Sequence, residues 1–175
     1  MPAEFDPAEL LRVLEAHKVE YVVIGAQAAL AHGAPIVTRD LDVTPSRDAD
    51  NLVRLVAALR DLEARLRTPS DPEGVAFPLE VGMLETADSW MLITRAGELD
   101  IVFVPDGTRG FDDLRRDATS VELGENLTVL VASLLDVIRS KEAASREKDA
   151  AQLPLLRRTL EEIRRREHDP PGPNP

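Results

Sequence analysis

Hydrophobic residues recur every three or four positions in several parts of the chain, which is the spacing of an amphipathic helix. This spacing predicts long helices over residues 6–18, 46–67, 133–144 and 147–167. Asp6 and Pro7 form a typical helix start, an N-cap followed by a first-turn proline. Pro154 is expected to bend the last helix or to mark its true beginning. Two short helices are predicted over 27–32 and 111–117.

Short runs rich in Val, Ile and Leu separate these helices and are typical of buried strands. They predict strands over residues 19–26, 35–45, 77–84, 89–97 and 98–105, and a small hairpin over 120–131 that turns at Gly124. The strands 89–97 and 98–105 are expected to meet in a tight turn at Ala96-Gly97, and 68–74 is expected to be a loop. Because strands and helices alternate, the predicted fold is α/β (α+β), with a mixed β-sheet flanked by helices.

The length of 175 residues suits one domain. We expect this domain to span residues 1–167, with a helical C-terminal part over about 132–167, and residues 168–175 to form a disordered tail. The chain has no cysteine, which excludes disulfides and thiolate metal sites. No apolar run is long enough to span a membrane, and the acidic N-terminus does not resemble a signal peptide, so we expect a cytoplasmic protein.

Charge is distributed unevenly along the chain. The net charge is −11, which argues against general affinity for nucleic acids. Residues 139–167, however, contain 9 basic and 6 acidic residues, a net charge of +3. If the protein contacts RNA or a nucleotide, this C-terminal segment is the expected surface, although two solvated helices would show the same composition.

The chemistry is concentrated in the stretch "GAQAALAHGAPIVTRDLDV", residues 25–43. Asp40 and Asp42 occupy alternate positions of a predicted strand, so their carboxylates point to the same face, with Cα atoms about 7 Å apart. Two carboxylates this close repel each other unless a cation lies between them. Mg²⁺ and Mn²⁺ accept such ligands, and a D-x-D pair can bridge two metal ions in phosphoryl or nucleotidyl transfer.

A third acid is expected in the strand "GELDIVFVP". Asp100 has apolar neighbours on both sides, and a carboxylate in such a setting is costly unless it is paired or bound to metal. Glu98 lies two residues earlier on the same face and is the rival ligand. We prefer Asp100, while noting that an edge strand with one solvated face would also alternate acidic and apolar residues.

Other side chains near these acids have two interpretations. Thr38 lies on the face of Asp40 and could bond a phosphate or a carboxylate, or could simply favour a strand. Arg39 is expected on the opposite face, and His32 is expected to cap or pack the short helix. Trp90 and Met91 are most simply explained as core residues.

Together these residues resemble the nucleotidyltransferase fold, in particular its minimal bacterial subgroup of AbiEii and MenT toxin-type proteins. The resemblance covers residues 19 to about 156. It lies in a strand that leads to a glycine turn, a short helix ending in "HG", the T-x-D-x-D strand, a later acidic strand, and a basic C-terminal segment. The matching residues are Gly25, Ala28, Gly33, Thr38, Asp40, Asp42, Asp100, Lys141, Arg146, Lys148 and Asp149.

The resemblance implies metal-dependent transfer of an NMP group from an NTP to an acceptor, with release of pyrophosphate. Asp40, Asp42 and Asp100 would hold Mg²⁺ or Mn²⁺, and Asp100 would also activate the acceptor hydroxyl. Lys141 or Lys148 would neutralise the departing pyrophosphate.

The turn after the first strand would bind the triphosphate. Its backbone amides at Gly25, Ala26 and Gln27 would contact the phosphates, with Thr38, Arg146 and Lys148 nearby. The family has Gly or Ser where this chain has Ala26, so a phosphate-binding hydroxyl is missing here and phosphate contact falls to backbone N–H groups or to Gln27.

Three functions are compatible with these features. The first is a nucleotidyltransferase that modifies RNA, such as tRNA, or a protein, and acts as a toxin with a cognate antitoxin. The second is a nucleotide- or partner-binding module that has lost turnover, which Ala26 favours. The third is an antitoxin that nucleotidylates its partner toxin, although the usual S-D-x-D motif of that group fits "TRDLD" less well.

Overall fold

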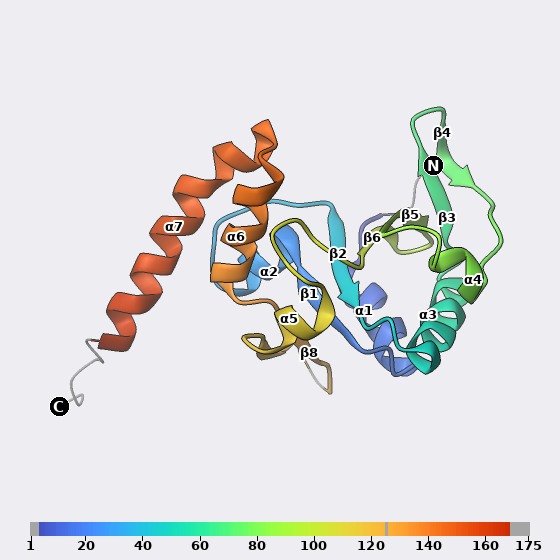
Figure 1. Ribbon diagram of the computed structural model, residues 1–175, viewed down its shortest axis with the longest axis horizontal. Coiled ribbons are helices and arrows are strands. Elements are labelled where there is room, and N and C mark those ends of the chain that lie inside the picture. The colour runs from blue at the N-terminus through green and yellow to red at the C-terminus, as the bar shows by residue number, and fades with distance from the viewer. Residues whose placement is uncertain (1–3, 125, 169–175) are drawn as a thin grey trace.

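An eight-stranded mixed sheet forms the centre of the computed structural model, which describes residues 4–124 and 126–168 (Figure 1). The strand order is β4-β3-β5-β6-β2-β1-β8-β7. In chain order the strands are β1 (Tyr21–Ile24), β2 (Asp40–Pro45), β3 (Arg65–Thr68), β4 (Asp71–Val75), β5 (Ser89–Thr94), β6 (Gly97–Val102), β7 (Thr119–Glu122) and β8 (Thr128–Val131). The helices are α1 (Pro7–Ala16), α2 (Gly25–Ala31), α3 (Ala49–Asp61), α4 (Val81–Leu84), α5 (Phe111–Arg115), α6 (Leu134–Ala144) and α7 (Glu147–His168). The predicted fold class is confirmed.

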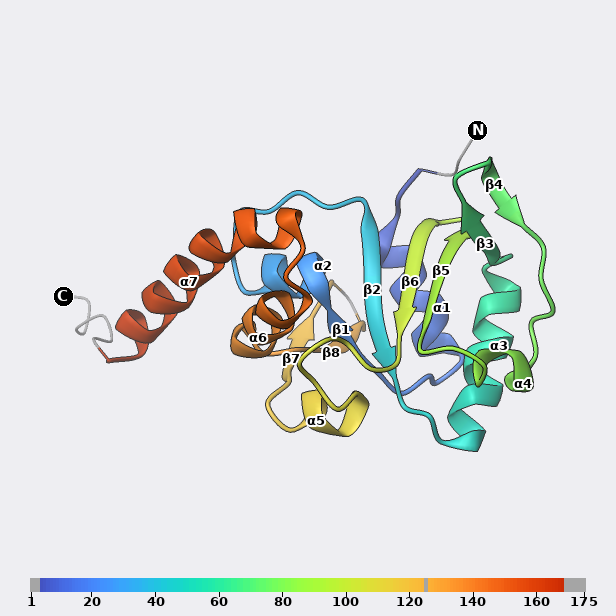
Figure 2. The same ribbon diagram turned by 45° about the horizontal axis from the view of Figure 1, so that its top comes forward.

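The central strands carry the most continuous apolar sequence. Every residue of β1 is buried, and Leu41, Val43, Leu99 and Ile101 fill the positions of β2 and β6 that alternate with the acidic residues. β2 runs antiparallel to β1 but parallel to β6. Figure 2 shows β2, β6 and β5 side by side, with α6 and α7 at one end of the molecule and α3, α4 and β4 at the other.

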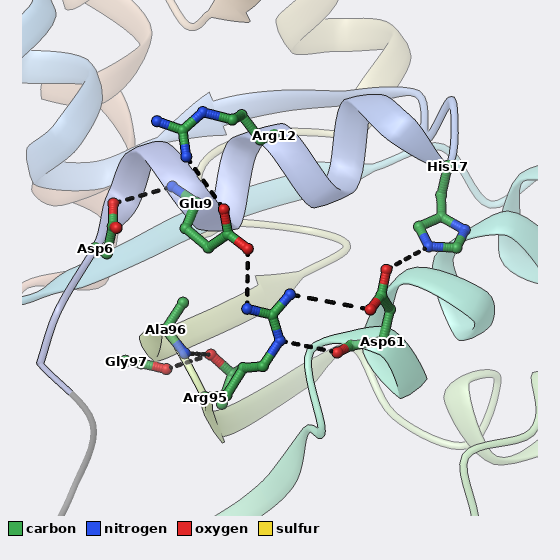
Figure 3. Close-up of polar contacts among 9 residues, drawn as sticks. Asp6, Glu9, Arg12, His17, Asp61, Arg95, Ala96 and Gly97 are labelled. Carbon is green, nitrogen blue, oxygen red and sulfur yellow. Dashed lines mark hydrogen bonds and ion pairs between the residues drawn. The ribbon is translucent and has the colours of Figure 1, made fainter.

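The first helix begins as its sequence predicts. Asp6 caps α1 by accepting a hydrogen bond from the backbone N–H of Glu9 at 3.0 Å, and Pro7 occupies the first turn. Figure 3 shows how α1 is tied to the rest of the chain. Arg95, in the turn between β5 and β6, binds the carboxylate of Glu9 at 2.9 Å and the backbone carbonyl of Asp61 at 3.1 Å. This arginine therefore joins the start of α1, the end of α3 and the β5–β6 hairpin.

The helix predicted over 46–67 is too long at its C-terminal end. It ends at Asp61, because Glu63 adopts a left-handed backbone with φ of 55° and Ala64 N–H bonds back to the carbonyl of Leu59 at 2.9 Å. Leu66 then pairs with Leu92 of β5 instead of continuing the helical face. The expected loop 68–74 is also wrong, since Asp71–Val75 forms β4 and pairs with β3.

The strand predicted over 77–84 is absent from the structure. This segment contains the single turn α4 instead, and Leu84 at its end is fully buried. Pro78 cannot donate a ladder hydrogen bond, and Phe77 stacks on Trp90 with ring centroids 5.6 Å apart. Side-chain burial is achieved here without strand pairing.

The remaining connections follow the sequence closely. The β5–β6 turn lies one residue earlier than predicted, since Thr94 pairs with Gly97, and β7 and β8 form the expected hairpin. Helix α7 continues through Pro154 and includes His168, which was expected to begin the tail. Residues 169–175 of that predicted tail lie outside the described residues. Among the described helices, none is both long and apolar enough to cross a membrane.

Candidate active site

Parallel pairing of β2 with β6 brings the three predicted acids together. Asp42 is the register partner of Asp100, and Asp40 is the partner of Glu98. Because side chains alternate along each strand, all four acids project from the same face. Asp40, Asp42 and Asp100 each offer a carboxylate oxygen within 4.8 Å of the others. Glu98 is outside this group and binds Arg67 instead.

Burial and mutual repulsion disfavour the charged forms of Asp42 and Asp100 in this acidic cluster. Burial is the largest cause that raises the pKa of Asp42 to about 7; the charges of Asp40 and Asp100 add to it, and Lys141 and Lys148 oppose it. Burial likewise raises the pKa of Asp100, against the opposing effect of Arg67. A divalent cation would relieve the repulsion, and three carboxylate oxygens are donors that Mg²⁺ and Mn²⁺ accept. These residues therefore fit such an ion.

Gly25 allows the chain to pass directly beside Asp42. Its φ is +65°, in the left-handed region that other residues rarely adopt. A Cβ atom at this position would lie 2.3 Å from Oδ2 of Asp42, well inside the van der Waals contact distance. A side chain at residue 25 would thus push the Asp42 carboxylate out of its place. Gly25 is required here by close approach as well as by backbone conformation.

The acidic cluster opens into a cavity of about 550 Å³ between the sheet, α6 and the beginning of α7. Predicted residues on its wall are Gly25, Ala26, Thr38, Asp40, Asp42, Asp100, Lys141, Arg146 and Lys148. Thr38 donates a hydrogen bond to Oδ1 of Asp40, so its hydroxyl orients a carboxylate. Gln27 is not among the lining residues.

Lys141 reaches the cavity from α6 but is already paired. Its Nζ lies 2.7 Å from Oδ1 of Asp149, a buried carboxylate of α7. Lys148 and Arg146 also line the cavity, and their side chains are exposed. Positive charge from two consecutive helices therefore faces the acidic cluster.

The expectations for four minor residues have different outcomes. Arg39 was expected to point away, but it lines the cavity, because β2 begins only at Asp40 and strand alternation does not extend to residue 39. Met91 was expected in the core, yet it is 51% exposed and also lines the cavity. Trp90 is buried as expected, and Nε2 of His32 lies 2.8 Å from the carbonyl oxygen of Ala132, a packing role.

Sequence reasoning missed Arg67, the basic residue closest to the third acid. Its Nη2 lies 3.0 Å from both carboxylate oxygens of Asp100, and its Nη1 donates to Oε2 of Glu98. Residue 67 was assigned to the end of a helix, where it would have no relation to β6. The alternation of Arg65, Leu66 and Arg67 is the signal that could have indicated a strand here.

Comparison with known proteins supports the fold and leaves the family open. No protein-family model and no curated protein sequence matches the chain. Among solved structures, the lincosamide antibiotic adenylyltransferase LnuA, with lincomycin bound, aligns with a TM-score of 0.57 and 15% identity. The alignment covers 88% of this chain and 98% of that one. A candidate nucleotidyltransferase from Thermotoga maritima aligns over 89% of this chain and 90% of its own, with a TM-score of 0.49 and 18% identity. The alignment with LnuA shows that the chain has the fold of nucleotidyltransferases.

Proposed function

We propose that the protein is a metal-dependent nucleotidyltransferase that moves an NMP group from an NTP to an acceptor and releases pyrophosphate. The observation that carries this proposal is the convergence of Asp40, Asp42 and Asp100, which offer carboxylate oxygens within 4.8 Å of one another on the wall of a cavity, in a chain with this fold. Asp40, Asp42 and Asp100 would hold Mg²⁺ or Mn²⁺, and the metal would supply Lewis-acid stabilisation of the phosphoryl oxygens.

The chain's own residues have separate roles in this proposal. Asp100 lies beside Arg67 and would accept the proton of the acceptor hydroxyl. Thr38 fixes the Asp40 carboxylate through its hydrogen bond, and Gly25 leaves room for that of Asp42. These contacts pre-organise the acids, so that little rearrangement is needed when the nucleotide binds.

The positive wall of the cavity would bind the triphosphate. Lys148 and Arg146 are exposed side chains on this wall and can reach an anionic ligand. Lys141 faces the acids and would neutralise the departing pyrophosphate, with Asp149 fixing its position. The backbone N–H of Ala26 would contact a phosphate oxygen, while Gln27 is left out of the proposed site.

The acceptor that we propose is RNA, such as tRNA, or another protein. In this proposal the nucleotidyltransferase itself is a toxin of the AbiEii/MenT subgroup, and a cognate antitoxin inhibits it. This proposal rests on the sequence resemblance and on the basic segment 139–167. A degenerate relative that binds nucleotide without turnover is the alternative, and the absence of a hydroxyl at Ala26 favours it. Cytoplasmic location and a single domain over 1–167 stay predictions.

Transfer of label from each α-labelled NTP tests the activity. The protein is incubated with Mg²⁺ or Mn²⁺ and, in turn, with total RNA, cell lysate protein, or an extract of small molecules. We expect labelled RNA or one labelled protein, and the labelled fraction identifies the acceptor class. Label in one partner protein encoded beside this chain would instead indicate an antitoxin that modifies its toxin.

Two variants make the result specific to the cluster. Asp42→Asn keeps the shape of the side chain and should abolish transfer without unfolding the protein. Asp112→Asn removes an exposed carboxylate that does not line the cavity and should leave transfer unchanged. Full activity of Asp42→Asn would contradict the metal assignment. Nucleotide binding without transfer under every condition would favour the degenerate relative.

A further inference from the structure

Arg67 links two carboxylates of β6 from a strand that is not their neighbour. β5 lies between β3 and β6, so the arginine side chain reaches over one strand to Glu98 and Asp100. Its side chain is only 26% exposed, and that of Asp100 is 10% exposed. A guanidinium held this way has two separate partners, one inside the acidic cluster and one outside it.

We propose that Arg67 and the divalent cation compete for Asp100, which makes Arg67 a positioning residue of the site. This inference rests on the proposed nucleotidyltransferase function. Arg67 holds both oxygens of Asp100 at 3.0 Å and supplies positive charge beside the cluster. Asp100 would have to release Arg67 to serve as a ligand of the cation, and Arg67 would keep its bond to Glu98.

The different exposure of the two partners makes this exchange feasible. Glu98 is 42% exposed and binds the other nitrogen of the guanidinium, Nη1. Arg67 can therefore release Asp100 without becoming an unpaired charge in a half-buried position, which would be unfavourable. An arginine with Asp100 as its single acidic partner would lose its only ion pair on releasing that carboxylate.

If Arg67 competes with the cation, its removal should change the metal affinity in the direction opposite to that expected from structural damage. Removing Arg67 frees Asp100 and removes a repulsive charge near the cation, so both effects strengthen metal binding. A purely structural salt bridge between β3 and β6 would, when broken, loosen the cluster and weaken metal binding. The direction of the change in metal affinity thus separates the two roles.

The measurement is the affinity of the whole protein for Mn²⁺ alone, by calorimetry or by the electron paramagnetic resonance of free Mn²⁺. Arg67→Gln should bind Mn²⁺ on the order of tenfold more tightly than the unmodified protein. Arg95→Gln is the matched control, because Arg95 also binds two acidic residues, Glu9 and Asp61 (Figure 3), but does not line the cavity. Its Mn²⁺ affinity should be unchanged.

Glu98→Gln provides a second variant in case Arg67→Gln fails to fold. Loss of the Glu98 carboxylate leaves Arg67 entirely to Asp100, so Mn²⁺ affinity should fall severalfold. Unchanged or weaker Mn²⁺ binding in folded Arg67→Gln, or unchanged binding in folded Glu98→Gln, would overturn the inference.

Failure of the inference can be told apart from failure of the proposed function. If the unmodified protein binds Mn²⁺ and Asp42→Asn removes this binding, the metal site stands, and a wrong sign in Arg67→Gln overturns competition alone. If the unmodified protein does not bind Mn²⁺, both proposals fall.

Discussion

Replacing Gly25 by alanine should have two consequences, strain in the backbone and displacement of the Asp42 carboxylate. Residue 25 has φ of +65°, where an L-residue costs about 1–2 kcal/mol relative to glycine. The new Cβ would also lie 2.3 Å from Oδ2 of Asp42. The carboxylate would have to retreat by about 1 Å to reach ordinary contact.

The two effects have very different expected sizes. Strain of about 1–2 kcal/mol lowers the melting temperature of a chain of this length by about 2–8 °C. A misplacement of about 1 Å at a reacting group costs on the order of 100-fold in rate. We therefore expect Gly25→Ala to remain folded, to lose most nucleotidyl transfer, and to bind Mn²⁺ at least about tenfold more weakly.

Gly33→Ala is the control for strain alone. Gly33 has φ of +87°, and a Cβ there would meet nothing within 4 Å. Thermal melts, Mn²⁺ titration and label transfer should show similar destabilisation in the two variants, but loss of metal binding and transfer only in Gly25→Ala. Equal activity of the two variants, or normal Mn²⁺ affinity in Gly25→Ala, would refute the geometric role of Gly25.

Four further variants test other contacts. Asp113→Asn should cost about 2 kcal/mol at pH 7. The backbone N–H of Arg109 is the largest of several contacts that lower the pKa of Asp113. The stability that this carboxylate contributes is therefore present above its ordinary pKa near 4 and is lost as the pH falls through the lowered value. Melts recorded from pH 8 to pH 3 should show the difference between Asp113→Asn and wild type beginning to shrink below about pH 4. Lys141→Ala should destabilise the fold by about 3 kcal/mol, because it leaves Asp149 unpaired. Lys148→Ala should reduce only nucleotidyl transfer, so equal melting temperatures of the two variants would contradict this expectation. Asn51→Ala should cost about 3 kcal/mol in urea unfolding, because its fully buried amide binds the backbone N–H and carbonyl of Glu20 and the carbonyl of Ser46; a loss below about 1 kcal/mol would contradict this.

The sequence by itself determined the elements whose signals are local. The N-cap at Asp6, the buried strand before Gly25 and the alternation of Asp40 with Asp42 all depend on neighbours within a few residues, so backbone geometry alone predicts them. The placement of Asp100 with this pair was inferred from a chemical argument, the high energy of an unpaired carboxylate in an apolar strand. The structure brings these three acids together, as predicted.

Only the tertiary structure decided which distant residues meet. Leu62 and Leu66 are four positions apart, as on a helix, and the competing choice of strand pairing with β5 depends on Leu92, far along the chain. Arg67 acquires its contact with Asp100 only through that pairing. The strand order of the sheet, which places β6 beside β2, is likewise set by packing energy summed over the whole molecule. Local periodicity records which face of an element is apolar, but it does not record which partner covers that face.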